Sequence, residues 1–183
     1  MKKIILTAAA VFAISFANAQ EAKSFGFAKG DFTIGGNIKS ISSDGSSYTE
    51  LTPSVGYFVS DKVSINASLS SVSGDTATDP DTGDTVSLES TTSFGVGARY
   101  YMLDLGERFK VYSGAGLSFG KDLTVLNAGI GVNYFLTQKL SINWGLASLI
   151  TYSKSGDVSA TVINLNEYRN FLNDSSFGLT YKF

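Results

Sequence analysis

Hydrophobic residues fall on every second position through most of this chain, and this alternation is the feature that most restricts its fold. Residues 63–70 are the purest case, reading Val-Ser-Ile-Asn-Ala-Ser-Leu-Ser. Successive side chains of a β-strand point to opposite faces, so this period predicts strands with one apolar and one polar face. About eight segments share it: 31–39, 48–59, 63–70, 87–101, 109–119, 124–135, 140–152 and a last one ending at 183.

The last segment alternates most strictly near its end. Phe177, Leu179, Tyr181 and Phe183 fall on one face, and Phe183 is the final residue of the sequence. A hydrophobic strand with a free edge tends to pair with strands of other chains. Closure of a sheet into a barrel removes the edge. We therefore expect the last strand to pair with the first.

The charged residues of the strands indicate which face meets lipid. Each of the seven lies on the parity opposite to the apolar set of its own strand: Asp31, Lys39, Glu50, Glu89, Arg99, Lys110 and Lys182. A charge on the lipid face of a membrane barrel costs about 2–4 kcal/mol at the bilayer midplane. The pattern therefore predicts that these seven charges lie in the lumen.

A water-soluble barrel with its apolar face inward is the alternative. The polar parity, however, is crowded with very small residues: Gly35, Ser54, Gly56, Gly95, Gly97, Gly114, Gly116, Gly129, Gly131, Gly145 and Gly178. A narrow eight-stranded barrel has little interior room, which suits small inward residues, whereas inward Phe, Tyr, Trp and Leu would overfill it. We expect an all-β fold, a single closed antiparallel transmembrane β-barrel of eight strands in meander order.

The first residues resemble an export signal. Lys2 and Lys3 precede an apolar run over residues 4–16, and Ala17-Asn18-Ala19 supplies small residues for cleavage. The run is too short to span a bilayer comfortably. We expect a signal peptide over 1–19, cleavage near Ala19, a barrel domain over 20–183 and a location in the outer membrane.

The connections alternate in length. Segments 60–62, 103–108 and 136–139 are short, whereas 71–86 and 153–173 are long and polar. Outer-membrane barrels place short turns in the periplasm and long loops outside. Residues 158–173 combine strand-like and helix-like spacing, so we expect an outer loop with a strand extension and a short helix.

Aromatic residues cluster beside the short turns. The expected interfacial girdle comprises Phe32, Tyr57, Phe58, Tyr100, Tyr101, Phe109, Tyr112, Tyr134, Phe135, Tyr181 and Phe183.

Composition excludes several kinds of chemistry. The chain has no His and no Cys, which removes Ser-His-Asp hydrolysis, thiolate nucleophiles, disulfides and most zinc or haem sites. Its net charge of −2 argues against nucleic acid as a partner. Glu50 or Glu89 opposite Arg99 or Lys39 could form a catalytic pair, but charges tying strands together across a lumen explain them better. We expect no catalytic residues, no cofactor and no enzymatic activity.

The long loop over 71–86 is acidic. Asp79, Asp81 and Asp84 faintly resemble part of a calcium loop. They lack the full ligand spacing and the closing bidentate Glu, so a solvated acidic loop is the better interpretation, with weak cation binding as the alternative.

Several short motifs together resemble a known family. They are Lys29-Gly30-Asp31-Phe32, Val55-Gly56-Tyr57-Phe58 before a Ser-Asp-Lys turn, and the final Tyr181-Lys182-Phe183. The mature chain resembles the small outer-membrane β-barrels related to the OmpX, OmpW and OmpA transmembrane domains, and its Ala-Asn-Ala-Gln junction is similar to those of Bacteroidetes-type secreted proteins. The resemblance implies insertion into outer-membrane lipid by the barrel assembly machinery. That machinery would recognise the final strand at Phe177, Leu179, Tyr181 and Phe183.

Three functions fit this sequence. The first is a structural or surface-interaction barrel with a largely filled lumen. The second is a narrow porin-like channel or a conduit for small or hydrophobic solutes. The third, disfavoured by the absence of His, is a lipid-modifying enzyme. The sequence identifies no ligand and no extracellular partner.

Overall fold

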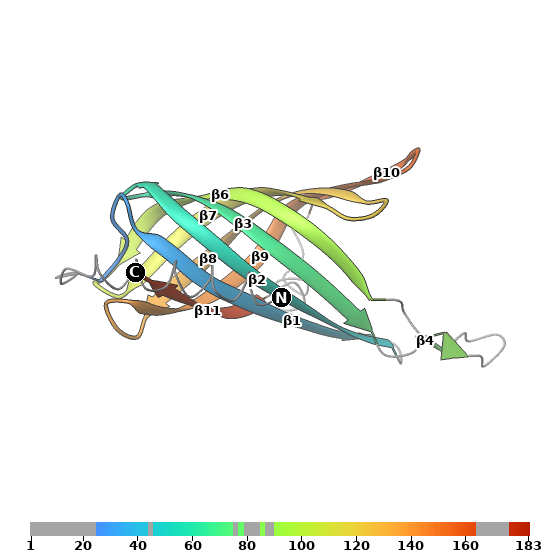
Figure 1. Cartoon of the computed structure of the whole chain (residues 1–183), viewed down its shortest axis with the longest axis horizontal. Coiled ribbons are helices and arrows are strands. Elements are labelled where there is room, and N and C mark those ends of the chain that lie inside the picture. The colour runs from blue at the N-terminus through green and yellow to red at the C-terminus, as the bar shows by residue number, and fades with distance from the viewer. Residues whose placement is uncertain (1–24, 44–45, 75–76, 79–84, 87–89, 164–175) are drawn as a thin grey trace, which may run out of the picture.

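The computed structural model describes residues 25–43, 46–74, 77–78, 85–86, 90–163 and 176–183. Within them the regular structure consists of β-strands, arranged as an elongated barrel (Figure 1). The strands are β1 (Phe32–Ser43), β2 (Ser46–Ser60), β3 (Val63–Gly74), β4 (Ala77–Thr78), β5 (Thr85–Val86), β6 (Thr91–Leu105), β7 (Phe109–Phe119), β8 (Thr124–Phe135), β9 (Leu140–Ser155), β10 (Val158–Ile163) and β11 (Ser176–Lys182). In the described part of the chain, no helix has the length and apolar character needed to cross a membrane.

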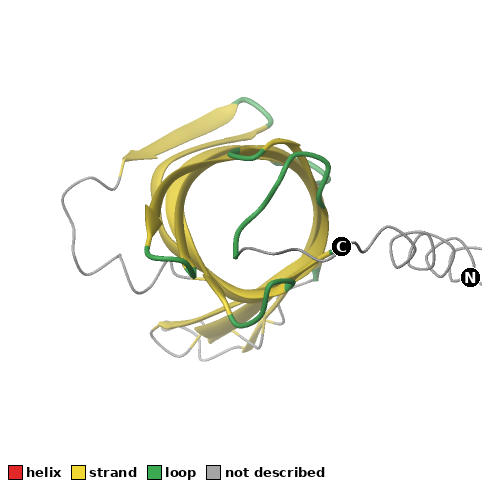
Figure 2. Ribbon diagram, turned by 90° about the vertical axis from the view of Figure 1, so that its left-hand side faces the viewer, coloured by secondary structure: helices red, strands yellow, loops and turns green. Residues whose placement is uncertain are grey.

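Eight of these strands close into a cylinder in the order β1-β2-β3-β6-β7-β8-β9-β11. All neighbours are antiparallel, and β11 completes the ring by pairing with β9 on one side and β1 on the other. The closing register runs from Thr33 opposite Lys182 to Ile38 opposite Phe177. The expected eight-stranded meander barrel and the pairing of its last strand with its first are confirmed, and Figure 2 shows the closed ring.

The strand boundaries follow the alternating segments closely. Both β7 and β8 have the expected limits, whereas β3 extends past residue 70 to Gly74 and β9 past 152 to Ser155. Four of the seven added residues are Ser. Hydroxyl side chains form favourable pairs across antiparallel strands. The ladders therefore continue beyond the apolar band.

A strand extension on β9 confirms part of the expectation for residues 158–173. After a turn at Gly156, whose φ is +56°, β10 folds back on the outer half of β9 from Val158 opposite Ser155 to Ile163 opposite Ile150. The lower half of β9 pairs with β11, so β10 is an extension and not a ninth barrel strand. The short helix was expected in residues that the structure does not describe.

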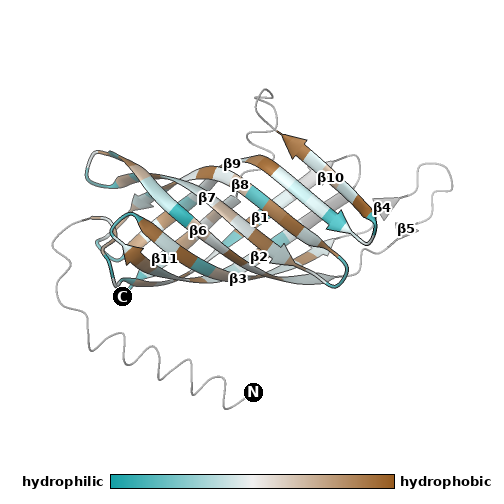
Figure 3. Cartoon of the chain, turned by 90° about the horizontal axis from the view of Figure 1, so that it is seen from above, coloured by the Kyte–Doolittle hydropathy of each residue, from teal (hydrophilic) through white to brown (hydrophobic). Residues whose placement is uncertain are grey.

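The two ends of the barrel differ as the connection lengths predict. The turns after β2, β6 and β8 lie at the same end as Phe183, while β4, β5 and β10 project from the other end (Figures 1 and 3). The short-turn end is the periplasmic end by the rule for outer-membrane barrels, and we call the opposite end the outer end.

The outer wall of the barrel is apolar and exposed. Ile65, Val96 and Phe177 are 52%, 42% and 52% exposed, whereas Ser64 and Asn133 are almost fully buried in the interior. Figure 3 shows hydrophobic residues recurring along the strands of the wall. This inversion of the usual order is unfavourable in water but suits a wall surrounded by hydrocarbon.

The apolar wall yields a test of the membrane fold. Val96 lies on the wall with Ala67 and Leu117 as cross-strand neighbours, so Val96→Arg should lower the free energy of unfolding in lipid vesicles by about 2–4 kcal/mol. Val158, 73% exposed on the β10 extension, is the matched control, and Val158→Arg should change it by no more than about 1 kcal/mol. Equal losses from both variants would contradict the assignment of the wall to lipid. Denaturant titration measures each value.

Candidate functional site

The segment before β1 occupies the periplasmic mouth of the barrel. Residues 25–31, which we call the strap, cross the mouth inside the ring of strands (Figure 2). Gly30 N donates to Phe58 O at 2.8 Å, and Lys29 N donates to Asp61 Oδ1 at 2.8 Å. The ammonium of Lys182 donates to Gly26 O at 2.6 Å. Contacts with two separated parts of the barrel, the end of β2 with its turn and the end of β11, thus hold the strap in the mouth.

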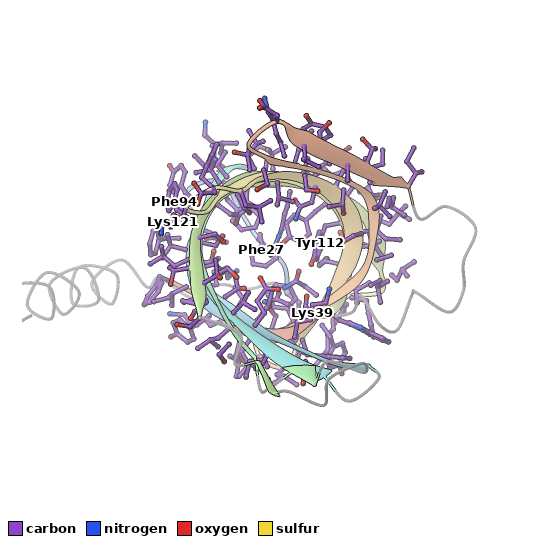
Figure 4. The ribbon with its side chains drawn as sticks, turned by 90° about the vertical axis from the view of Figure 1, so that its right-hand side faces the viewer. Phe27, Lys39, Phe94, Tyr112 and Lys121 are labelled. Carbon is purple, nitrogen blue, oxygen red and sulfur yellow. The ribbon has the colours of Figure 1, made fainter. Side chains whose placement is uncertain are left out.

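An aromatic layer fills the barrel around the strap. The ring of Phe27 stacks on Phe58, with centroids 4.2 Å apart and planes at 14°, and lies 4.9 Å from Tyr101 and 5.0 Å from Phe135. The rings of Tyr101 and Tyr112 are 5.5 Å apart. We call these five side chains the aromatic floor, and Figure 4 shows Phe27 and Tyr112 within the ring of strands. Centroid distances of this size are those of favourable aromatic pairs.

The aromatic floor corrects the expected interfacial girdle. Phe58, Tyr101, Tyr112 and Phe135 are at most 7% exposed and face inward. Other members of the expected set do face outward, with Tyr57 and Tyr100 among them at 44% and 49% exposed. The prediction that all of these aromatics form a girdle is therefore wrong. The inward aromatics pack against Phe27 of the strap, which explains why they face the lumen and not the lipid.

Two ion pairs accompany the strap. The ammonium of Lys182 lies 3.4 Å from Asp31 Oδ2, and both side chains are largely buried. The ammonium of Lys110 lies 3.0 Å from Asp104 Oδ2, and the backbone of Gly26, with φ +128°, passes beside the Lys110 side chain. Four charges are therefore paired near the mouth, three of them among those expected in the lumen.

A belt of neutral polar groups lies beside the aromatic floor. Tyr101 Oη donates to Asn133 Oδ1 at 3.3 Å, and Asn133 Nδ2 donates to Ser141 Oγ at 3.1 Å and to Asn143 Oδ1. Asn143 Nδ2 donates in turn to Thr180 Oγ1. The chain of bonds links β6, β8, β9 and β11 across the interior. Buried amides that are satisfied in this way stabilise and orient the strands.

Inward glycines make room for these side chains. A Cβ atom on Gly131 would collide with the Tyr112 ring, and one on Gly56 would lie 2.6 Å from both Asn66 Oδ1 and Thr33 Oγ1. Each of these glycines lets a side chain of the neighbouring strand lie against the wall. This packing explains the small residues of the inward parity.

The middle of the lumen holds a polar cavity of about 240 Å³ above the aromatic floor. Arg99 and Tyr112 lie at its base, and the guanidinium carbon of Arg99 is 4.8 Å from the centre of the Tyr112 ring. Asparagine and serine side chains line its sides, and Asn127 on its wall is exposed to solvent. The lumen is thus filled at one end and hollow in its middle.

The outer half of the lumen contains Lys39 and Glu50, which face one another in the register of β1 and β2. A carboxylate oxygen of Glu50 accepts hydrogen bonds from Ser70 Oγ and Thr52 Oγ1. The structure gives Arg99 contacts with tyrosines and not with Glu50. Of the combinations considered as a catalytic pair, Glu50 and Lys39 are therefore brought opposite one another, whereas Glu50 and Arg99 are not.

The remaining expected site residues fall in two groups. Glu89, Asp79, Asp81 and Asp84 lie outside the described residues, and within the described ranges no three acidic side chains gather as metal ligands would. The four residues of the expected assembly signal lie along β11 and at the residue that follows it. Phe177 stacks on Trp144 at 5.2 Å, and the rings of Tyr181 and Phe183 are 5.0 Å apart.

A closed eight-stranded barrel with an apolar outer wall and a polar, charged interior defines the class of small outer-membrane β-barrels. The chain belongs to the outer membrane protein beta-barrel domain family, whose model matches residues 5–183. It is accordingly a protein of the outer membrane.

One solved structure supports this fold, and a second is reported for comparison. The N-terminal β-barrel domain of Pseudomonas aeruginosa OprF matches with a TM-score of 0.53 at 15% identity, covering 85% of this chain and 98% of that one. The Yersinia pestis outer membrane protein Ail, solved in a phospholipid bilayer nanodisc, matches with a TM-score of 0.47 at 16% identity, covering 85% and 99%. No curated protein matches the sequence. At such identity the OprF match supports the barrel fold, and the Bacteroidetes-type origin stays a prediction.

The packing of Tyr112 over Gly131 leads to a second test. Gly131→Ala should lower the free energy of unfolding by about 1–3 kcal/mol, because the added methyl group overpacks the lumen against the ring. Gly36→Ala is the matched control, since its new Cβ would meet Pro53 and Thr52 at 3.5 Å, an ordinary contact. Denaturant titration in the same vesicles compares them. A Gly131 variant as stable as the control would contradict the packing argument.

Proposed function

We propose that this protein is a structural or surface-interaction barrel of the outer membrane that does not pass solutes. The observation that carries the proposal is the strap, seated in the periplasmic mouth against the aromatic floor. A path through the lumen would have to displace Phe27 from its stack with Phe58 and break the bond between Lys182 and Gly26 O. The barrel would then serve the integrity of the envelope or present its outer strands to partners.

The projecting strands support a role at the surface. The strand β10 extends beyond the barrel wall, and its six residues are all exposed. Val158 and Ile163 are hydrophobic and are 73% and 59% exposed. No catalytic role is proposed, because Asp31, Lys110, Lys182 and Glu50 form ion pairs or hydrogen bonds at different levels of the lumen and do not converge with Arg99 on one reaction centre.

Conductance distinguishes this proposal from the channel alternative. The purified protein in planar bilayers should show no steady openings, because the strap blocks one mouth. Replacing Phe25 and Phe27 together by Ser should produce openings, since it removes the contacts of Phe27 with the floor and of Phe25 with the Arg108 guanidinium, 4.4 Å away. Phe94→Ser, on the outer wall, is the control and should stay silent.

Steady openings of the wild-type protein would overturn the closed-barrel proposal and favour a narrow channel. Silence of the strap variant, with its heat-dependent gel mobility intact, would show that something other than the strap blocks the lumen.

We further propose that residues 1–19 are a signal peptide cleaved near Ala19 and that the barrel assembly machinery reads the final strand. Phe183 N donates to Phe32 O at 2.9 Å, so the last residue also joins β1. Its ring packs beside Tyr181 and Phe32. The same ring would therefore be recognised by the assembly machinery and contribute to packing in the folded barrel.

Phe183→Ala separates recognition from structure. In cells, the folded barrel recovered from the outer membrane should fall several-fold because the terminal aromatic is missing. The purified variant should refold in vitro with a free energy of unfolding within about 1 kcal/mol of wild type, because the backbone bond to Phe32 survives. Quantitative blotting of heat-modifiable protein gives the first value and denaturant titration the second. An equal loss in both assays would assign Phe183 a structural role only.

A further inference from the structure

Arg99 is a lumen cation without a partner carboxylate in the described structure. Its guanidinium lies on the face of Tyr112 at 4.8 Å, and its Cγ packs near Gly114 of the adjacent strand. Among the residues that the structure describes, none forms an ion pair with it. Removing a charge from water is costly unless an opposite charge or hydrogen bonds compensate it.

The described lumen carboxylates are engaged at other levels of the barrel. Asp31 lies 3.4 Å from the Lys182 ammonium near the periplasmic mouth. Glu50 accepts hydrogen bonds from Ser70 and Thr52 in the outer half. Neither of these two carboxylates is therefore left to neutralise Arg99.

The polar cavity lies directly beside the unpaired guanidinium. It has a volume of about 240 Å³, room for a small solute, and asparagine and serine side chains from several strands line it. One of its lining groups, Asn37 Oδ1, is buried without a hydrogen-bond partner. This oxygen accepts hydrogen bonds, so an occupant that satisfies it must also carry a hydrogen-bond donor.

We propose that Arg99 and this cavity form a binding site for a small solute that carries an oxyanion, a carboxylate or a phosphate group. The planar guanidinium presents paired N–H donors that fit such a group. Tyr112 covers one face of the guanidinium and Tyr101 takes up part of its donor edge, so the remaining N–H donors are left for the ligand. Asparagine amides and serine hydroxyls of the cavity then bind the remaining polar atoms.

The ligand enters from the outer end. Asn127, which lines the cavity, is exposed to solvent, whereas the aromatic floor and the strap occupy the periplasmic side. The direction of entry follows from the closed floor of the proposed function, while the anion site itself requires only Arg99 and the cavity. Anion binding and conductance are therefore separate measurements, and failure of one leaves the other intact.

The test uses the purified full-length protein in detergent micelles with isotope-labelled arginine. The Arg99 Nε–H resonance is followed by NMR while sodium acetate or sodium phosphate replaces sodium chloride at constant ionic strength. A saturable chemical-shift change with either oxyanion is expected. The oxyanion that binds with the higher affinity indicates whether the ligand carries a carboxylate or a phosphate group. Absence of saturation with both would overturn the proposal.

Variants then assign the binding to Arg99. Followed through the amide resonances of cavity residues, Arg99→Gln should weaken binding about tenfold or more, and Arg99→Lys should retain an intermediate affinity, as expected for loss of a charged hydrogen-bonding group. Lys110→Gln is the charge-matched control and should bind like wild type, because Lys110 is paired with Asp104 near the mouth. Equal weakening of anion binding by Lys110→Gln and Arg99→Gln would show that the affinity depends on net charge alone, and it would contradict the proposed site. Heat-modifiable gel mobility verifies that each variant is folded. If Arg99→Gln does not fold, the titration of the wild-type Arg99 Nε–H resonance alone tests the proposal.

Discussion

The pairing of β1 with β11 is the interaction on which the rest of the structure depends. In hydrocarbon, every backbone N–H and C=O group must be hydrogen-bonded within the protein, because no water is available there. Six residue pairs, from Thr33–Lys182 to Ile38–Phe177, join the two ends of the sheet and leave no edge in the barrel wall. Without them the strands would expose unpaired polar groups to lipid, and the exposed apolar wall would lose its favourable environment.

Closure with eight strands also makes the interior narrow, and the side chains show how that space is divided. Near the periplasmic mouth, large rings pack around Phe27, and farther in, side chains such as Tyr112 and Asn66 lie over glycines of adjacent strands. In the middle the wall carries mostly Gly, Ser and Asn, which leave the cavity of about 240 Å³. The same small residues therefore permit tight packing where a neighbour has a large side chain and create a cavity where it does not.

The strands were predictable because lipid enforces a period of two on the outward residues, and the limits of β7 and β8 are those that this period predicts. The direction of the aromatics was not, because Tyr57-Phe58, Tyr100-Tyr101 and Tyr134-Phe135 place rings on both parities. Residues 25–31 carry no alternation, so nothing in the sequence pattern predicts a strap. The surroundings of Arg99 depend on register, which sets it opposite Ser64 and Gly114, and spacing along one strand does not reveal such neighbours.

The described lumen charges differ in chemistry with depth. Two lysines, Lys182 and Lys110, occur at the mouth, where each meets a carboxylate and the strap backbone is close by, and a third, Lys39, lies opposite Glu50 in the outer half. Arginine occurs at the base of the cavity. A lysine ammonium is a compact, strongly hydrated charge, whereas a guanidinium is weakly hydrated and stacks on an aromatic face. Tyr112 can therefore hold Arg99 in place without neutralising it. The aromatic floor consequently has two effects: it packs around the strap in the mouth, and it holds at the base of the cavity a guanidinium that has no described carboxylate partner.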